Sequence, residues 1–252
     1  MTRSRLIIAA VAVVAAVAIG GFILYDQVLR GDSAAALALP PASTAPAAST
    51  AAGASTDPAA SVAASAATSG GAVAGTWTVA ADSVAGYRVR EQLANLPAES
   101  DAVGRTDQVT GSITVETSGA TTTLTAASLS VDMTSLASDK TMRDNRLRRE
   151  GLETDAFPTA TFVLTAPVEV PAAALAGTAS DITLTGDLTV HGVTKSVQIP
   201  AQAQLVNGTI QVAGSLTFPL SDYAIVAPNI GAVIVSIAED GTLEFLINFT
   251  KS

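Results

Sequence analysis

Apolar and polar residues alternate along most of this chain after residue 76, and this alternation restricts the fold more than any other feature. Between positions 182 and 190, Ile182, Leu184, Leu188 and Val190 occupy one phase, with Gly186 completing the series and polar residues between them. Successive side chains of a β-strand point to opposite faces, so such a segment is a strand with one buried and one wetter face. We count about eight or nine such segments, mostly antiparallel, and a sheet of that size tends to close or to fold over on itself.

Turn signals and one change of phase add detail to this all-β reading. Asn207-Gly208 and Asp240-Gly241 are sequences that favour the positive φ of a tight hairpin turn, so both predict hairpins. The apolar phase changes between Leu124 and Leu129. Because a shift of one residue moves every later side chain to the other face, we expect a β-bulge near Ala127.

The N-terminal part contains an uninterrupted, uncharged and mostly apolar run from Leu6 to Tyr25. A helix of that length spans about 30 Å, which is the thickness of the hydrocarbon core of a membrane. Two arginines precede the run, and this arrangement keeps the N-terminus in the cytoplasm and places the rest of the chain outside. We therefore interpret residues 1–30 as a single-pass membrane anchor. The alternative is a cleaved signal peptide, with cleavage after Ala36 or Ala38 and a secreted protein, but the apolar core is longer than such peptides need.

Residues 31–75 consist almost entirely of Ala, Ser, Thr, Pro and Gly. Such a composition cannot bury enough apolar surface to offset the entropy of ordering the chain. We expect a disordered linker with a root-mean-square reach of about 35–40 Å. The folded domain is then confined to residues 76–252.

Residues 139–150 lack the alternation and predict a short helix at one end of the barrel. Ser138 suits the N-cap position and Gly151 suits the C-terminal stop. The supporting acid-before-base pairs are Asp139 with Arg143 and Asp144 with Arg148. The basic residues here form either an exposed face with internal ion pairs or a lip that meets an anionic headgroup or a membrane surface.

Composition excludes several classes of function. The chain has no Cys, which excludes disulfides, thiolate metal sites and a cysteine nucleophile. Its one histidine, His191, lies on a polar phase beside a turn glycine, where we expect a surface position at a hairpin end. The formal net charge of −9 repels a phosphate backbone, so we expect no nucleic-acid partner. We predict no metal site, no catalytic residues and no cofactor apart from a bound lipid.

Three ordered segments of the sequence resemble the YceI-like family. They are Trp77-Thr78-Val79 through Tyr87, the stretch from Arg143 to Phe162 with Asp155-Ala156-Phe157-Pro158, and Gly186 through Lys195. The resemblance implies an extended, lipocalin-like antiparallel β-barrel that binds a long isoprenoid chain, such as a polyprenyl lipid or an isoprenoid quinone, in an apolar tunnel. It also implies an exported, cell-envelope protein, and because some members form dimers it allows a homodimer.

The residues that would contact such a lipid fall into two groups. The apolar candidates, which in an ordinary barrel would only fill the core, are Trp77, Val89, Phe162, Leu184, Leu188, Phe218, Phe245 and Phe249. The candidates for a polar rim are Arg143, Asp144, Arg146 and Arg148.

The leading hypothesis is a membrane-tethered, extracytoplasmic carrier or scavenger of an isoprenoid-type lipid, without catalysis. A surface interaction or stress protein with a filled barrel is the first alternative, and a lipid-modifying enzyme is the second. The alternation alone does not decide between a hollow and a filled barrel, because a barrel of eight strands can be either.

Overall fold

A computed structural model describes residues 33–40, 73–93, 99–227 and 234–252. The strands are β1 (Gly75–Val79), β2 (Val84–Leu93), β3 (Ser100–Thr106), β4 (Val109–Ser118), β5 (Thr121–Asp132), β6 (Thr159–Leu164), β7 (Val168–Glu169), β8 (Ser180–Val190), β9 (Val193–Val206), β10 (Thr209–Pro219) and β11 (Ile234–Lys251). The helical elements are η1 (Met133–Ser135), α3 (Thr141–Arg146), the π-helical turn η2 (Leu147–Gly151), α4 (Ala172–Leu175) and η3 (Leu220–Tyr223).

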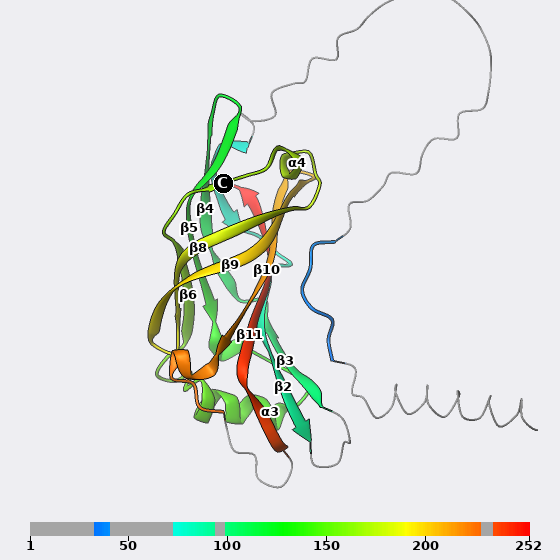
Figure 1. Cartoon of the computed structure of the whole chain (residues 1–252), viewed down its shortest axis with the longest axis vertical. Helices are drawn as coiled ribbons and strands as arrows, with labels where there is room; N and C mark the ends of the chain where they lie inside the picture. Colours follow the sequence, from blue (N-terminus) through cyan, green and yellow to red (C-terminus); the bar gives the residue numbers. More distant parts are fainter. Residues whose placement is uncertain (1–32, 41–72, 94–98, 228–233) are drawn as a thin grey trace, which may run out of the picture.

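Eight strands form a closed antiparallel ring in the order β1-β4-β5-β6-β8-β9-β10-β11, and β1 completes the ring by pairing with β11. The remaining long strands, β2 and β3, extend the sheet from β11 as β11-β2-β3 (Figure 1). The expected all-β, lipocalin-like barrel with a short helix at one end is therefore confirmed.

The barrel is closed in one half and split in the other. Both β1 and β2 pair with the same edge of β11, so they are two pieces of one strand that is broken between Val79 and Val84. At this break, Ser83 Oγ donates to the carbonyl of Ala80 (2.7 Å) and accepts from the backbone N–H of Asn248 (3.0 Å). Beyond it, β3 pairs with β2 on one edge, and on its other edge only a single bridge joins Arg105 to Ala137.

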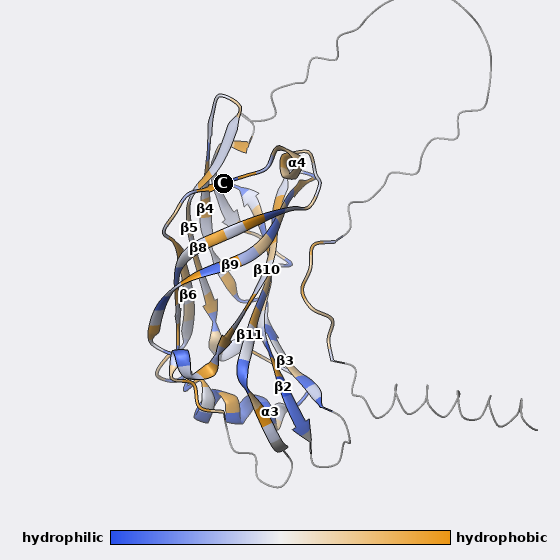
Figure 2. Cartoon of the chain, in the orientation of Figure 1, coloured by the Kyte–Doolittle hydropathy of each residue, from blue (hydrophilic) through white to orange (hydrophobic). Residues whose placement is uncertain are grey.

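The two halves differ in their contents. In the closed half, Trp77, Val115 and Phe249 are at most 3% exposed and fill the interior. The connection from η1 through α3 to η2 lies at the end of the split half, where Figure 1 shows it below the strands. Figure 2 shows the strands banded by alternating hydropathy and α3 as mostly hydrophilic. The open end of the split half is therefore covered by the connection from η1 to η2, and not by further paired strands.

Some predicted turns are confirmed and one is wrong. Asn207 and Gly208 have φ of 51° and 77° and form the tight hairpin between β9 and β10. Asp240-Gly241 forms no hairpin, because β11 runs through it, and a register shift against β2 lies between Ile237 and Gly241. The phase change in β5 is a bulge at Thr125, two residues before the predicted position, so the bulge itself is confirmed.

The predicted helix is shorter than expected and begins differently. It starts at Thr141, because the oxygen of Ser138 does not cap it; Ser138 donates from both its backbone N–H and its hydroxyl to the carboxylate of Asp144. The predicted ion pair between Asp144 and Arg148 is wrong, because the carboxylate of Asp144 bonds to Ser138. Arg148 donates to the backbone carbonyl of residue 144 instead. The pair between Asp139 and Arg143 is confirmed at 2.5 Å, and the helical turns end at residue 151 as predicted.

The predicted anchor at residues 1–30 lies outside the described residues. Within the described ranges, no helix is long and apolar enough to cross a membrane. Of the predicted linker, residues 33–40 and 73–75 are described. Residues 33–40 lie against the outside of the barrel, whereas Val73 is buried in the barrel and Gly75 already begins β1. Residues 41–72 lie outside the described part of the chain.

A glycine in β8 provides a test of the packing between β6 and β8. A Cβ at Gly186 would lie 2.4 Å from the carbonyl oxygen of Val163 and 2.5 Å from the ring of Phe162. Because the backbone oxygen cannot rotate away, we expect Gly186→Ala to lower the free energy of unfolding by about 1–3 kcal/mol, measured by urea denaturation. Thr183→Ala, at an exposed position of the same strand, is the control. Equal effects of the two substitutions would contradict this packing.

Candidate ligand-binding cavity

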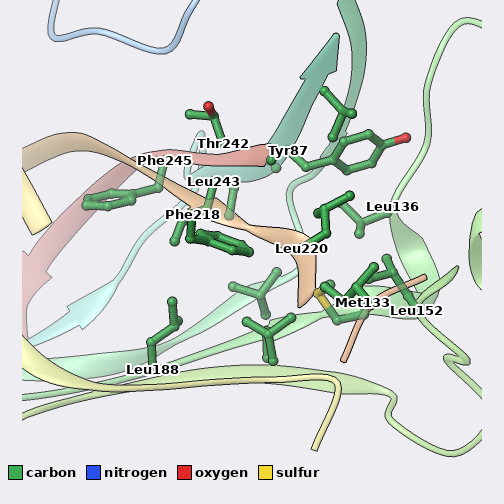
Figure 3. A pocket seen from close by; sticks show the side chains of 18 of the residues that line it. Tyr87, Met133, Leu136, Leu152, Leu188, Phe218, Leu220, Thr242, Leu243 and Phe245 are labelled. Atoms are coloured by element: carbon green, nitrogen blue, oxygen red, sulfur yellow. The ribbon is translucent and has the colours of Figure 1, made fainter. Parts of the chain in front are cut away.

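A cavity occupies the split half of the barrel, between the strands and the helical connection (Figure 3). Its volume is about 200 Å³, counted as the space open to the centre of a water-sized sphere. One water needs about 10–15 Å³ by that measure, so the space admits about 13–20 groups of that size. In Figure 3, Leu188 of β8 faces Phe218 of β10 and Leu243 of β11 across this space.

The cavity wall is almost entirely apolar. Of the 31 residues that line it, 26 are apolar side chains or glycine. The others are Tyr87, Glu91, Arg143, Thr161 and Thr242. A wall of this kind suits an apolar ligand with few polar groups, because each buried polar group of a ligand would need a partner that the wall does not supply.

Six of the eight predicted apolar residues line the cavity, and two do not. The six are Val89, Phe162, Leu184, Leu188, Phe218 and Phe245. Trp77 and Phe249 lie in the filled half, and Trp77 Nε1 donates to the carbonyl of Val73 there (2.8 Å). Both residues point inward, as the cavity residues do. They lie in the other half of the barrel, however, where inward side chains pack against one another and fill the interior.

The helical connection supplies cavity residues, most of which the alternation did not indicate. Met133 of η1, Leu147 of η2 and the flanking Leu136 and Leu152 all line the cavity, and Figure 3 places Met133 and Leu152 next to each other. Met133 continues the alternating phase at the end of β5, but Leu147 lies in the segment without alternation, and Leu136 and Leu152 flank that segment. The apolar character of these three leucines among many charges was the only available signal, and it did not show which way they point.

A charged pair forms the polar edge of the cavity. Glu91 lies on the inward phase of β2 and is 3% exposed, and its carboxylate accepts a hydrogen bond from Nη2 of Arg143 on α3. The other terminal nitrogen of Arg143, Nη1, donates to Asp139 at 2.5 Å. Both terminal nitrogens of the guanidinium therefore have carboxylate partners already.

Tyr87 lies at the same edge. Its hydroxyl is buried and has no hydrogen-bond partner among the described residues, as is also true of Nε of Arg143. Burial raises the pKa of the Tyr87 hydroxyl far above its ordinary value, so this group stays protonated and remains a donor. In Figure 3 the hydroxyl points away from Leu188 and Phe218, toward the outer edge of the cavity.

The family of the chain follows from a comparison of the whole sequence. A model of the YceI-like domain matches residues 57–249. The chain belongs to this family. The match contains all three sequence segments that carried the resemblance, together with every residue that lines the cavity.

Two solved structures share the fold of this YceI-like domain. A polyisoprenoid-binding domain from Saccharophagus degradans, implicated in plant cell wall breakdown, is 22% identical, covers 70% of this chain and 98% of that domain, and has a TM-score of 0.54. BcnA from Burkholderia cenocepacia is 18% identical, covers 67% of this chain and 99% of its own, and has a TM-score of 0.51. At these identities the likeness shows the fold alone. A search of curated proteins finds no match.

Two of the sequence segments typical of this YceI-like domain meet in space. The turn between β8 and β9 consists of His191 and Gly192, with φ of 50° and 74°. The ring of Phe157 packs edge-on against the imidazole, with the centroids 4.6 Å apart. Nε2 of the imidazole lies 3.0 Å from the carboxylate of Glu153, and Nδ1 lies 3.1 Å from the carbonyl oxygen of Tyr223. The histidine thus joins three connections at a hairpin end.

The predicted rim residues other than Arg143 lie away from the cavity wall of this YceI-like domain. Asp144 is buried beneath Ser138, and Arg146 pairs with Glu150 at 3.7 Å. Arg148 lines a separate polar depression on the outer side of the connection. Within the described residues, no three His, Asp or Glu side chains lie together as metal ligands would.

Breaking the buried pair between Glu91 and Arg143 should destabilise the fold strongly. In Glu91→Gln, a guanidinium that is 12% exposed loses a charged partner, so we expect the free energy of unfolding to fall by about 3 kcal/mol, measured by urea denaturation. The control is Glu150→Gln, which removes an exposed partner of Arg146 and should cost less than about 1 kcal/mol. A loss as small as that of the control would mean that the buried pair does not hold α3 to β2.

Proposed function

We propose that this protein is a membrane-tethered, extracytoplasmic binding protein for a long isoprenoid-type lipid, which it carries or scavenges without catalysis. The observation that carries the proposal is the cavity, because 26 of its 31 lining residues are apolar or glycine. Each methylene that is buried in such a space contributes about 0.8 kcal/mol, so a long chain binds without any specific polar contact. The cavity also argues against the alternative of a filled barrel.

The family supports this ligand class. The domain from Saccharophagus degradans that shares the fold is described as polyisoprenoid-binding, and the match covers 98% of it. In the present chain, the apolar cavity offers the same kind of environment. The tether comes from the sequence, since the apolar run from Leu6 to Tyr25 is long enough to cross a bilayer.

The charges at the cavity edge favour a lipid with an uncharged headgroup. Both terminal nitrogens of Arg143 already have carboxylate partners in Glu91 and Asp139, so the guanidinium has little capacity left for an anionic headgroup. A phosphate or diphosphate would also approach the buried carboxylate of Glu91 in a setting where repulsion is poorly screened. A hydroxyl or a quinone carbonyl would meet no such repulsion.

The first test is whether the protein carries a lipid in its cavity. We expect organic extracts of the purified full chain to contain a lipid with repeating five-carbon units, identified by mass spectrometry. Leu188→Asn should reduce the bound amount at least tenfold, because it places an amide in the apolar wall. Thr189→Asn, the adjacent residue on the outward phase, should leave the amount unchanged.

The outcome that would defeat the proposal is equally clear. Wild-type protein that is repeatedly empty, and that takes up neither a polyprenol nor an isoprenoid quinone from detergent micelles, binds no lipid of this class. Equal losses in both variants would show that the lipid lies outside the barrel.

The second test concerns the headgroup. Delipidated protein should bind a polyprenol or an isoprenoid quinone at least tenfold more tightly than a polyprenyl phosphate of the same chain length, as measured by displacement of a fluorescent fatty probe. Replacing the two carboxylates, in Glu91→Gln with Asp139→Asn, should reduce that preference. A preference for the phosphate in the wild-type protein would overturn the charge argument while leaving the lipid class intact.

A further inference from the structure

A segment that precedes the folded domain is docked on the outside of the barrel. Residues 33–40, which we call the strap, have no regular secondary structure. The hydroxyl of Ser33 donates to the carbonyl of Asp101 and accepts from its backbone N–H (3.1 and 3.2 Å). Further along, the carbonyl of Pro40 accepts from Nε2 of Gln204 (3.3 Å). The strap is drawn in blue beside the barrel in Figure 1.

The barrel holds the strap through two arginines that point outward. Arg88 of β2 donates to the carbonyl of Ala34 (2.6 Å), and Arg105 of β3 donates to the carbonyl of Ala35. Both arginines also pair with Glu244 of β11, at 3.6 Å and 2.7 Å. Because both arginines bond to backbone carbonyls, they recognise the backbone of an extended peptide and not particular side chains.

The outer face under the strap is unusual for a barrel surface. Glu244 lies between two inward residues of β11, so it points outward, yet it is 2% exposed. Gln204, the outward residue of β9 that contacts the strap, is also 2% exposed. An outward carboxylate with so little exposure needs a cover and charged partners, because an unpaired buried charge is strongly unfavourable. The two arginines and the strap together supply that cover.

The strap has a definite direction along the barrel. Its first residue binds Asp101 at the beginning of β3, in the split half that contains the cavity. Its last residue binds Gln204 near the end of β9, beside the hairpin at residues 207 and 208. The chain therefore reaches the barrel at the cavity end and leaves it toward the filled end, as Figure 1 shows.

We propose that the strap holds the cavity end of the barrel toward the membrane. The inference rests on the anchor in the proposed function. Tyr25, the last residue of the apolar run, is eight residues before Ser33, so a fully extended chain spans at most about 29 Å between them. A docked strap therefore keeps the cavity end close to the bilayer.

Without the strap, the opposite end would face the membrane. The next described residue after the strap is Val73, which is buried beside Trp77 in the filled half. It lies 48 residues after Tyr25, and a flexible chain of that length has a root-mean-square span of about 35–42 Å. The barrel would then be attached to the anchor through its filled end. The strap thus reverses the orientation and lets an apolar chain pass between the bilayer and the cavity over a short distance.

The orientation can be measured with fluorescent labels, because the chain has no cysteine of its own. One variant carries Met142→Cys on α3 at the cavity end, where the side chain is 67% exposed. The other carries Ala120→Cys in the exposed hairpin between β4 and β5 at the filled end. The full chain is inserted into phosphatidylcholine vesicles with an acceptor dye on the lipid headgroups. β11 alone has 18 residues and spans about 60 Å, so we expect energy transfer to be at least threefold greater from position 142 than from position 120.

Strap variants test the cause of that difference. Leu37 and Leu39 are the half-buried residues of the strap, whereas Ala36 and Ala38 are exposed. Leu37→Ser with Leu39→Ser, or a Gly/Ser replacement of residues 33–40, should abolish or reverse the difference between the two labels. Ala36→Ser with Ala38→Ser introduces the same number of hydroxyls and should preserve it.

The outcomes separate this inference from the proposed function. Equal transfer from the two labels in the wild-type strap, or an unchanged difference in both strap variants, overturns the inference. Flotation of the same vesicles tests the anchor, because a chain that does not float with them has no anchor and the inference fails with it. Lipid extraction from the same samples reports on the cavity independently, and its failure alone would leave the orientation intact.

Discussion

The break between β1 and β2 is the constraint on which the rest of the structure depends. Ser83 and Asn248 hold it by hydrogen bonds, and side chain Nδ2 of Asn248 also donates to the carbonyl of Asp82 (2.9 Å). On one side of the break the sheet closes through β1, and its inward side chains meet and fill the interior. On the other side β2 and β3 leave the ring and do not close it onto β4, and a cavity remains between the strands and the helical connection. One local bend thus separates a half that supplies stability from a half that has room for a ligand.

A split barrel needs a cover, and here a charged pair helps to hold the cover. Within the connection, α3 is short and mostly hydrophilic, whereas the flanking Leu136 and Leu152 are buried in the apolar cavity wall. The bond from Arg143 to Glu91 ties α3 to the inward face of β2. A buried ion pair contributes little net stability compared with apolar packing, but removing one partner is costly, so the pair specifies where the connection sits. The same pair places a buried carboxylate and an already paired guanidinium at the cavity edge, so the position of the cover and the polarity of the site have one cause.

Three sequence segments indicated the family, and period-two alternation predicted the strands and six of the eight apolar candidates that line the cavity, because it reports directly on which side chains face inward. It did not separate Phe245, which lines the cavity, from Phe249, which fills the core, because both have the same phase and only their position relative to the break differs. Asp240-Gly241 has the composition of a hairpin turn, yet pairing with β2 and β10 on both edges carries β11 through it as a bulge. Asp144 has the spacing of a helical ion pair, but a backbone N–H and a hydroxyl of Ser138 satisfy it first. In each case contacts in the folded chain decided between local alternatives that the spacing of residues leaves open.

Strands β2 and β3 carry cavity residues on their inner face and strap-binding arginines on their outer face. Along β2, Tyr87 and Glu91 point inward to the cavity edge, and Arg88 points outward to the strap. This division follows from alternation alone, since neighbouring residues of a strand face opposite sides. Because Arg88 and Arg105 both pair with the buried Glu244, replacing either would remove one of the two cationic partners of that carboxylate and would disturb the strand that borders the cavity. The strap contributes only carbonyls, one hydroxyl and two half-buried leucines to this arrangement. Substitutions in the strap can therefore change the orientation of the barrel without altering the residues that line the cavity.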